Sequence, residues 1–184
     1  MSRAFRAICA LIPLLLPVSA RAWEWSLGSH MAAGVTRSGA NSGTSTAFGL
    51  PGNTLTYQPG FRIGYGNPSR VHEVTLDAGA LVIGEEGSTV SLILGTIGYQ
   101  YAFGRSATSN PIANVGLGFL REGSALAAGT NPTLGVGVGW RRVLRDQRGD
   151  LRVELRYDYL NGGGPFARPN LTTIGLRLGF DLWL

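Results

Sequence analysis

The sequence predicts an all-β fold, an eight-stranded antiparallel up-and-down transmembrane β-barrel with a polar, filled interior. Three observations support this prediction. Apolar and polar residues alternate over eight segments, glycine recurs at alternate positions in several of them, and the charged residues of these segments share one face. A period of two indicates strands whose two faces meet different surroundings. Bacterial barrels of this kind have an even number of strands.

The final segment, residues 172–184, alternates most regularly. One face carries Ile174, Leu176, Leu178, Phe180, Leu182 and Leu184, and the other carries Thr173, Gly175, Arg177, Gly179, Asp181 and Trp183. Its 13 residues suffice for a tilted transmembrane strand, which needs about 9–11. The segment resembles the closing strand of bacterial outer-membrane barrels, although Leu184 departs from their commonest, aromatic ending. The resemblance implies that the outer-membrane assembly machinery reads this strand.

The N-terminus has the features of a secretory signal peptide. Arg3 and Arg6 precede an apolar run over residues 7–18, and Ala20-Arg21-Ala22 follows as a cleavage site. The run is too short for a membrane anchor, which needs about 20 residues, and two prolines interrupt it. We expect residues 1–22 to be removed and residues 23–184 to form one barrel domain.

Composition excludes several functions. Three of the sixteen arginines leave with the signal peptide, so the mature chain carries thirteen arginines against eleven acids, about +2 in place of the formal +5. This balance gives no reason to expect a nucleic-acid partner. Cys9 lies in the signal peptide, so no disulfide or cysteine site remains. His30 and His72 lie on different strands with opposite parity, and we expect no metal or cofactor.

We expect strands at residues 23–33, 55–65, 71–83, 89–103, 111–120, 132–143, 150–160 and 172–184. Residues 34–53 are rich in Gly, Ser, Thr and Asn, lack periodicity and are predicted to form a loop, as are residues 121–131 and 160–170. Pro59 conflicts with a continuous second strand, because a closed barrel has no edge for a missing N–H. A bulge there, or a strand that starts at Gly60, would resolve the conflict.

The predicted connections also suggest an orientation. With the N-terminus in the periplasm, the longer set, after the first, fifth and seventh strands, faces outward as barrels of this type prefer, and the short connection after the third strand is the exception. Aromatic residues near the opposite, periplasmic strand ends predict an aromatic girdle. These residues are Trp23, Trp25, Tyr65, Tyr101, Phe103 and Trp140.

Charge decides which face is inside. Glycine alternates with arginine in the strands at residues 132–143 and 172–184, and such glycines leave room for long side chains in a narrow barrel. An arginine facing lipid at the bilayer midplane would cost about 2–4 kcal/mol. We therefore expect an interior ion-pair network of five arginines and six acids, too crowded for a wide channel. Its members are Glu24, Arg62, Glu73, Asp77, Arg141, Arg152, Glu154, Arg156, Asp158, Arg177 and Asp181.

One segment resembles an enzyme family. Residues 157–162, followed by Pro169 and Asn170, look like the region of the lipid A 3-O-deacylase family that carries a His-x-Ser-Asn segment. The histidine of that segment falls on Asp158, the serine on Leu160, and only Asn161 matches. Leucine cannot act as a nucleophile. If the kinship is real, this chain should lack the deacylase activity.

Over its mature length the chain is similar to the small eight-stranded outer-membrane proteins, the class of the OmpA transmembrane domain, OmpX, OmpW and the opacity-type proteins. The resemblance implies a monomer in the outer membrane of a Gram-negative bacterium, with surrounding lipid and lipopolysaccharide as partners. We expect a non-enzymatic structural or surface-interaction role through outward loops, where Arg37, Arg121 and Arg168 would meet lipopolysaccharide. The alternatives are an inactive lipid A hydrolase-like barrel and a narrow channel for small solutes.

Overall fold

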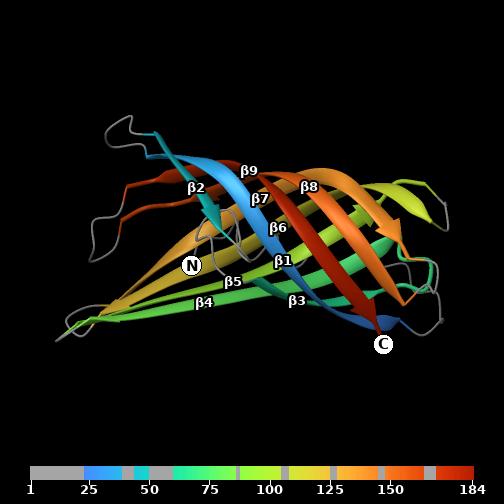
Figure 1. The fold of residues 1–184 in the computed structure, drawn as a ribbon, viewed down its shortest axis with the longest axis horizontal. Helices are drawn as coiled ribbons and strands as arrows, with labels where there is room; N and C mark the ends of the chain where they lie inside the picture. The colour runs from blue at the N-terminus through green and yellow to red at the C-terminus, as the bar shows by residue number, and fades with distance from the viewer. Residues whose placement is uncertain are drawn as a thin grey trace, which may run out of the picture.

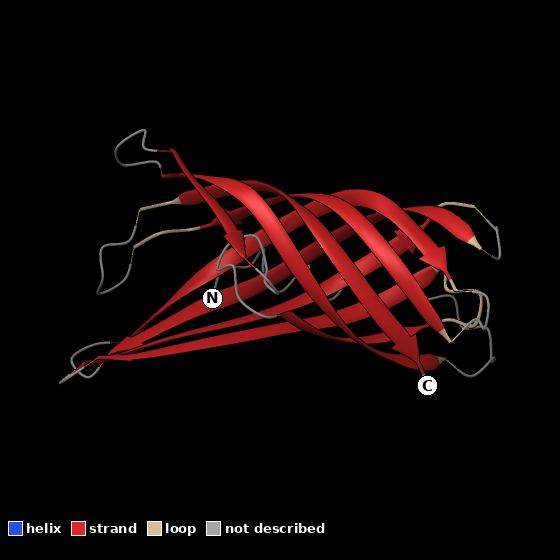
Figure 2. Ribbon diagram, viewed as in Figure 1, coloured by secondary structure: helices blue, strands red, loops and turns tan. Residues whose placement is uncertain are grey.

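The computed structural model describes residues 23–38, 44–49, 60–85, 88–104, 108–124, 128–144, 148–163 and 169–184. These residues form nine strands in chain order, drawn in Figures 1 and 2. The strands are β1 (Glu24–Ser38), β2 (Thr44–Gly49), β3 (Gly60–Gly66), β4 (His72–Glu85), β5 (Ser88–Ala102), β6 (Ser109–Ser124), β7 (Ala128–Val143), β8 (Gly149–Leu160) and β9 (Leu171–Trp183). Within this part of the chain, no helix is long and apolar enough to cross a membrane.

The nine strands form the predicted eight-stranded antiparallel barrel. β2 and β3 count as one strand of the wall, because both lie on the same side of β1, one beyond the other. From β3 to β9 each strand pairs with the next, and β9 pairs with β1 from Ser26 to Ser38 to close the ring. The first half of β1 pairs with β3, and its second half pairs with β2. We call the end where β1 begins and β9 finishes the terminal end, and the opposite end the hairpin end (Figure 1).

The predicted second strand and the loop before it need correction. Residues 34–53 are not one loop, because β1 continues to Ser38 and β2 pairs with it from Ala32 to Arg37. The wall position resumes at Gly60, opposite His30, which is the start we gave as one resolution of the conflict at Pro59. Residues 54–59 lie outside the described part. Over the described residues, no ladder joins β2 to β4.

Several hairpins also extend further than predicted. The predicted loop at residues 121–131 is wrong at both ends, because β6 continues to Ser124 and β7 starts at Ala128. Residue pairs Arg121–Thr130 and Glu122–Gly129 continue the β6–β7 ladder there. Connection length therefore does not separate the two ends of the barrel. The start of β1 and the finish of β9 lie at one end of the barrel.

The two faces of the wall differ as predicted. On β7 and β8 the outward residues Val138 and Leu155 are 59% and 51% exposed, whereas the inward Arg152 is 1% exposed. The same alternation of exposed and buried positions runs through β9. Apolar side chains therefore form the outer surface of the barrel, and most charged side chains of the strands lie inside.

The interior is not polar throughout. Leu94, Leu120 and Leu160 are inward-facing, at most 4% exposed, and pack together with Leu171 against them. These residues belong to the hairpin-end halves of β5, β6, β8 and β9, and we call them the leucine cluster. The cluster lies between the ion pairs of β8 and the hairpin end, where Glu122 of β6 is also buried.

Inward glycines allow atoms of the neighbouring strands to come closer than a Cβ atom would permit. A Cβ added to Gly139 would meet the Val153 carbonyl oxygen and come within 2.8 Å of the Glu154 Cα on the neighbouring strand. A Cβ at Gly179 would lie 2.9 Å from Arg152 Nη2. Glycine at these positions lets charged side chains of β8 occupy the interior.

We predict that Gly139→Ala destabilises the refolded barrel by about 1–3 kcal/mol, because backbone atoms of β8 must move to admit the methyl group. Gly84→Ala is the matched control, since nothing lies within 4 Å of its Cβ position. The measurement is denaturant unfolding in lipid vesicles, followed by tryptophan fluorescence. Equal stability of the two variants would contradict the close packing of β7 against β8.

Candidate functional site

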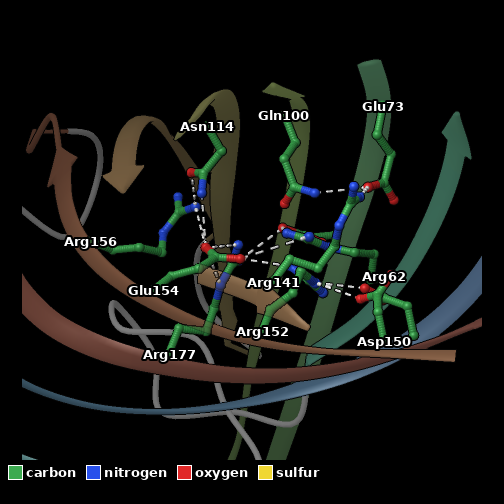
Figure 3. Close-up of polar contacts among 12 residues, drawn as sticks. Arg62, Glu73, Gln100, Asn114, Arg141, Asp150, Arg152, Glu154, Arg156 and Arg177 are labelled. Atoms are coloured by element: carbon green, nitrogen blue, oxygen red, sulfur yellow. Dashed lines mark hydrogen bonds and ion pairs between the residues drawn. The ribbon is translucent and has the colours of Figure 1, made fainter. Parts of the chain in front are cut away.

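The charged interior is centred on β8. Arg152, Glu154, Arg156 and Asp158 occupy alternate positions of this strand and all point inward, because a strand turns every second side chain to the same face. Figure 3 shows Arg152, Glu154 and Arg156 with residues from other strands of the wall. One strand thus supplies four of the charged groups that fill the lumen.

Glu154 is the most highly connected carboxylate. It is 1% exposed and accepts hydrogen bonds from Arg152 Nη1 and Arg177 Nη2, each at 2.6 Å. Asn114 Nδ2 donates to it at 2.9 Å. Arg156 Nη1 lies 3.8 Å and Arg62 Nη1 lies 4.0 Å from its oxygens. Four guanidinium groups therefore share the negative charge of Glu154.

Asp77 joins the opposite wall to this centre. Arg62 binds it with two hydrogen bonds, 2.6 Å from Nε and 3.0 Å from Nη2, and Arg177 Nη1 donates to it at 3.0 Å. Asp158 is bound by Arg156 at 2.9 Å and 3.3 Å. Such charge-assisted and bidentate bonds are the strong ones in a low-dielectric interior.

A second layer lies nearer the terminal end. Arg152 Nε donates to Asp181 at 2.6 Å, and Trp183 Nε1 donates to Asp150 at 2.8 Å. Glu73 accepts from Gln100 at 2.9 Å and lies 3.8 Å from Arg141 Nη1. Several buried atoms here make no hydrogen bond to the described residues, among them Asp150 Oδ1, Asp181 Oδ1, Arg152 Nη2 and Gln100 Oε1. The hydrogen bonds in this layer are as short as those around Glu154, but more of its buried polar atoms lack a described partner.

The turn between β3 and β4 covers the terminal end of the lumen. Its Arg70 has a left-handed backbone (φ 53°), its carbonyl accepts from Arg141 Nη2, and its guanidinium lies 4.5 Å from the Trp183 ring centre. Partial burial lowers the pKa of Arg70, and the charges of Asp150 and Glu24 oppose that effect. The turn, the penultimate residue and the interior network are thereby joined.

Ten of the eleven predicted network residues are buried in the lumen, and the exception is Glu24. Its side chain is 40% exposed at the terminal rim, 3.9 Å from Arg70. Sequence reasoning missed Arg70, Gln100, Asn114, Asp150 and Trp183 as members. Asp150 lies two residues before Arg152 and therefore faces the same side of the strand, so the alternation could have predicted it as a member. Arg70 lies in a turn, where parity says nothing.

The two histidines have different surroundings. His30 points inward, is 2% exposed, and neither of its ring nitrogens has a hydrogen-bond partner among the described residues. His72 faces outward at the terminal end, with its Nδ1 2.6 Å from the Tyr99 hydroxyl. The described residues contain no group of three or more His, Cys, Asp or Glu arranged to hold a metal ion.

Asp158 and Leu160, the two positions that replace the histidine and serine of the deacylase family, point into the lumen. Asp158 is held by Arg156, and Leu160 is fully buried in the leucine cluster. Gly162 N donates to Asn170 Oδ1 at 2.7 Å beside this segment. Leu160 offers no nucleophile to a lipid outside the wall.

Two of the three arginines expected to meet lipopolysaccharide, Arg37 and Arg121, lie on strands. Arg37 ends the outward face of β1, and Arg121 follows Phe119 on the outward face of β6; both are exposed. Arg168 lies outside the described residues. The predicted loop positions of Arg37 and Arg121 are therefore wrong, because the ladders continue past them.

Aromatic side chains gather on the outer surface at the terminal end. Trp23 and Trp25 contact Tyr65 with ring centres 5.1 Å and 4.6 Å apart, and Tyr101 contacts Phe103 at 4.9 Å. Trp140 donates to the Ser109 hydroxyl at the same end. These positions suit rings that lie where hydrocarbon meets water.

Removal of the Glu154 charge should destabilise the barrel strongly. We predict that Glu154→Gln lowers the free energy of unfolding by about 3–5 kcal/mol, because buried guanidinium groups lose their shared partner. Glu24→Gln, which removes an exposed ion pair, should change it by less than about 1 kcal/mol. Urea unfolding in vesicles checks both, and similar values for the two variants would show that the interior ion pairs contribute little.

No protein-family model matches the sequence, and the comparison with curated proteins finds no match either. Among solved structures, Neisserial surface protein A (NspA) is similar with a TM-score of 0.62 at 17% identity, over 86% of this chain and 96% of that one. The N-terminal barrel of Pseudomonas aeruginosa OprF gives 0.46 at 17% identity, over 85% and 97%. Ail of Yersinia pestis gives 0.45 at 11% identity, over 88% and 100%. The likeness to NspA concerns the fold alone, and the chain has the fold of the small eight-stranded outer-membrane barrels.

Proposed function

We propose that this protein is a non-enzymatic barrel of the outer membrane of a Gram-negative bacterium, with a structural or surface-interaction role at its hairpin end. The observation that carries the proposal is the distribution of polarity across the wall. Outward Val136, Leu155 and Leu176 are 44%, 51% and 55% exposed, while Arg141, Arg152 and Arg177 of the same three strands are buried inside. A wall of this kind suits a lipid environment.

The two rims support an orientation in that membrane. Aromatic rings occupy the terminal end, as in the interfacial belt of membrane barrels. Arg37 and Arg121 end the outward faces of β1 and β6 at the hairpin end, where they would meet the phosphate groups of lipopolysaccharide. β1 begins and β9 finishes at the terminal end, so the hairpin end would face outward.

The alternatives have less support. A hydrolase related to the lipid A deacylases would need a nucleophile where Leu160 lies buried. A channel would need a path through the network around Glu154 and then through the leucine cluster. We therefore place the activity of this protein on its surface, as a partner of lipid or of other surface molecules.

The proposal predicts where a new charge is tolerated. Val136→Arg, at mid-height on the outward face of β7, should destabilise the barrel in lipid by about 2–4 kcal/mol. Thr130→Arg on the same face at the hairpin end should cost less than about 1 kcal/mol. Unfolding in vesicles measures both effects. Fractionation of the expressed full chain, with heat-modifiable electrophoresis, then tests the location, and recovery of a folded chain outside the membrane would refute the proposal.

A further inference from the structure

We propose that Arg37, Thr172 and Tyr159 form a binding site on the outside of the barrel for a phosphate group of lipid A. The inference rests on the proposed function, because it requires the hairpin end to lie in the lipopolysaccharide leaflet. It goes beyond that function by assigning one lipid, one chemical group and three side chains on neighbouring strands. We call these three residues the Arg37 row.

The ladders place the row on one line across the wall. Arg37 of β1 lies opposite Thr172 of β9, and Thr172 lies opposite Tyr159 of β8. Neighbouring strands are about 4.8 Å apart, so a guanidinium, a hydroxyl and a phenol stand side by side. Arg37 is exposed, and the other two are half-buried. Figure 1 shows β1, β9 and β8 as neighbours in the wall.

The outward residues below the row are suited to acyl chains. Val35, Ile174 and Tyr157 form the next line towards the terminal end and are 44%, 55% and 44% exposed. Leu176 and Leu155 follow at 55% and 51%. A cation with two hydroxyl groups above an apolar surface matches an amphipathic lipid that has a phosphate above its acyl chains. Arginine and hydroxyl groups are strong ligands for phosphate oxygens.

The backbone beneath the row is held from inside. Thr36 and Thr173, the inward neighbours of Arg37 and Thr172, share a hydrogen bond of 2.8 Å between their hydroxyl groups. Leu160, next to Tyr159, is fully buried in the leucine cluster. A site on paired strands with buried supports is better ordered than a site on loops.

Two other outward arginines provide controls. Arg121 of β6 lies opposite Thr130 of β7 at the same end, without a tyrosine in the line. Arg142 of β7 is exposed on the outward face at the terminal end, opposite Leu151. Arg121 tests whether any arginine at the hairpin end is enough to bind the phosphate. Arg142 tests whether any outward arginine is enough.

The experiment titrates the refolded full mature barrel in detergent with bis-phosphorylated lipid A, dephosphorylated lipid A and phosphatidylglycerol, measured by native mass spectrometry. Wild type should bind phosphorylated lipid A about tenfold more tightly than either other lipid. Arg37→Gln should remove about tenfold of that affinity and leave the dephosphorylated form unchanged. Tyr159→Phe should weaken it about two- to threefold, and Arg142→Gln should have no effect.

Heat-modifiable electrophoresis of each variant confirms folding before titration. If Arg37→Gln folds poorly, Tyr159→Phe still tests the site. Equal binding of phosphorylated and dephosphorylated lipid A would overturn the site, even in a barrel that enters the outer membrane. Equal binding of phosphatidylglycerol, or loss of affinity in Arg121→Gln but not in Arg37→Gln, would also overturn it. Failure of the chain to reach the membrane would instead reject the proposed function.

Discussion

Neutralisation of charge in a narrow lumen is the constraint on which the rest of this structure depends. An eight-stranded ring has room inside only for side chains, so every arginine that enters must lie against a carboxylate. Glu154 satisfies this need for Arg152 and Arg177 at 2.6 Å each. Gly135, Gly137 and Gly179 follow from the same constraint, because Arg156 or Arg152 of β8 lies where their Cβ atoms would be. With the charges inside, the outward positions are left apolar, and the barrel matches lipid.

Parity along each strand was enough to predict which residues face inward, and it also predicted the fold. A period of two assigns a face to every residue once the strand is known, which is why Arg152 and Leu155 were placed correctly. The same pattern does not say where a strand stops. Residues 34–38 and 121–124 have compositions that suit a strand or a loop equally, and the pairing partner decides between them. Arg37 and Arg121 were expected in loops for this reason, although Thr172 and Thr130 lie opposite them in continuous ladders.

Partner choice inside the lumen was beyond sequence reasoning. Arg177 binds Asp77, one hundred residues earlier in the chain, because the ring brings β9 and β4 together across the interior. Arg70 reaches Trp183 from a turn, where alternation carries no information. Leu94, Leu120 and Leu160 occupy inward positions of strands that also carry buried polar residues, Gln100 on β5 and Asn110 on β6 among them. Only their meeting in space identifies them as a second, apolar layer.

The order of these layers bears on function. A solute that entered from the terminal end would meet Arg70 and Trp183, then the ion pairs around Glu154, and then the leucine cluster. An apolar solute would be opposed by the ion pairs, and a charged solute would be opposed by the leucine cluster. Neither kind of solute therefore has a favourable path through both layers. The outer surface also changes along the barrel axis. Aromatic rings lie at the terminal end, and arginines beside hydroxyl groups lie at the hairpin end. Because the interior is filled, the surface role that we propose would depend on these two outer rims.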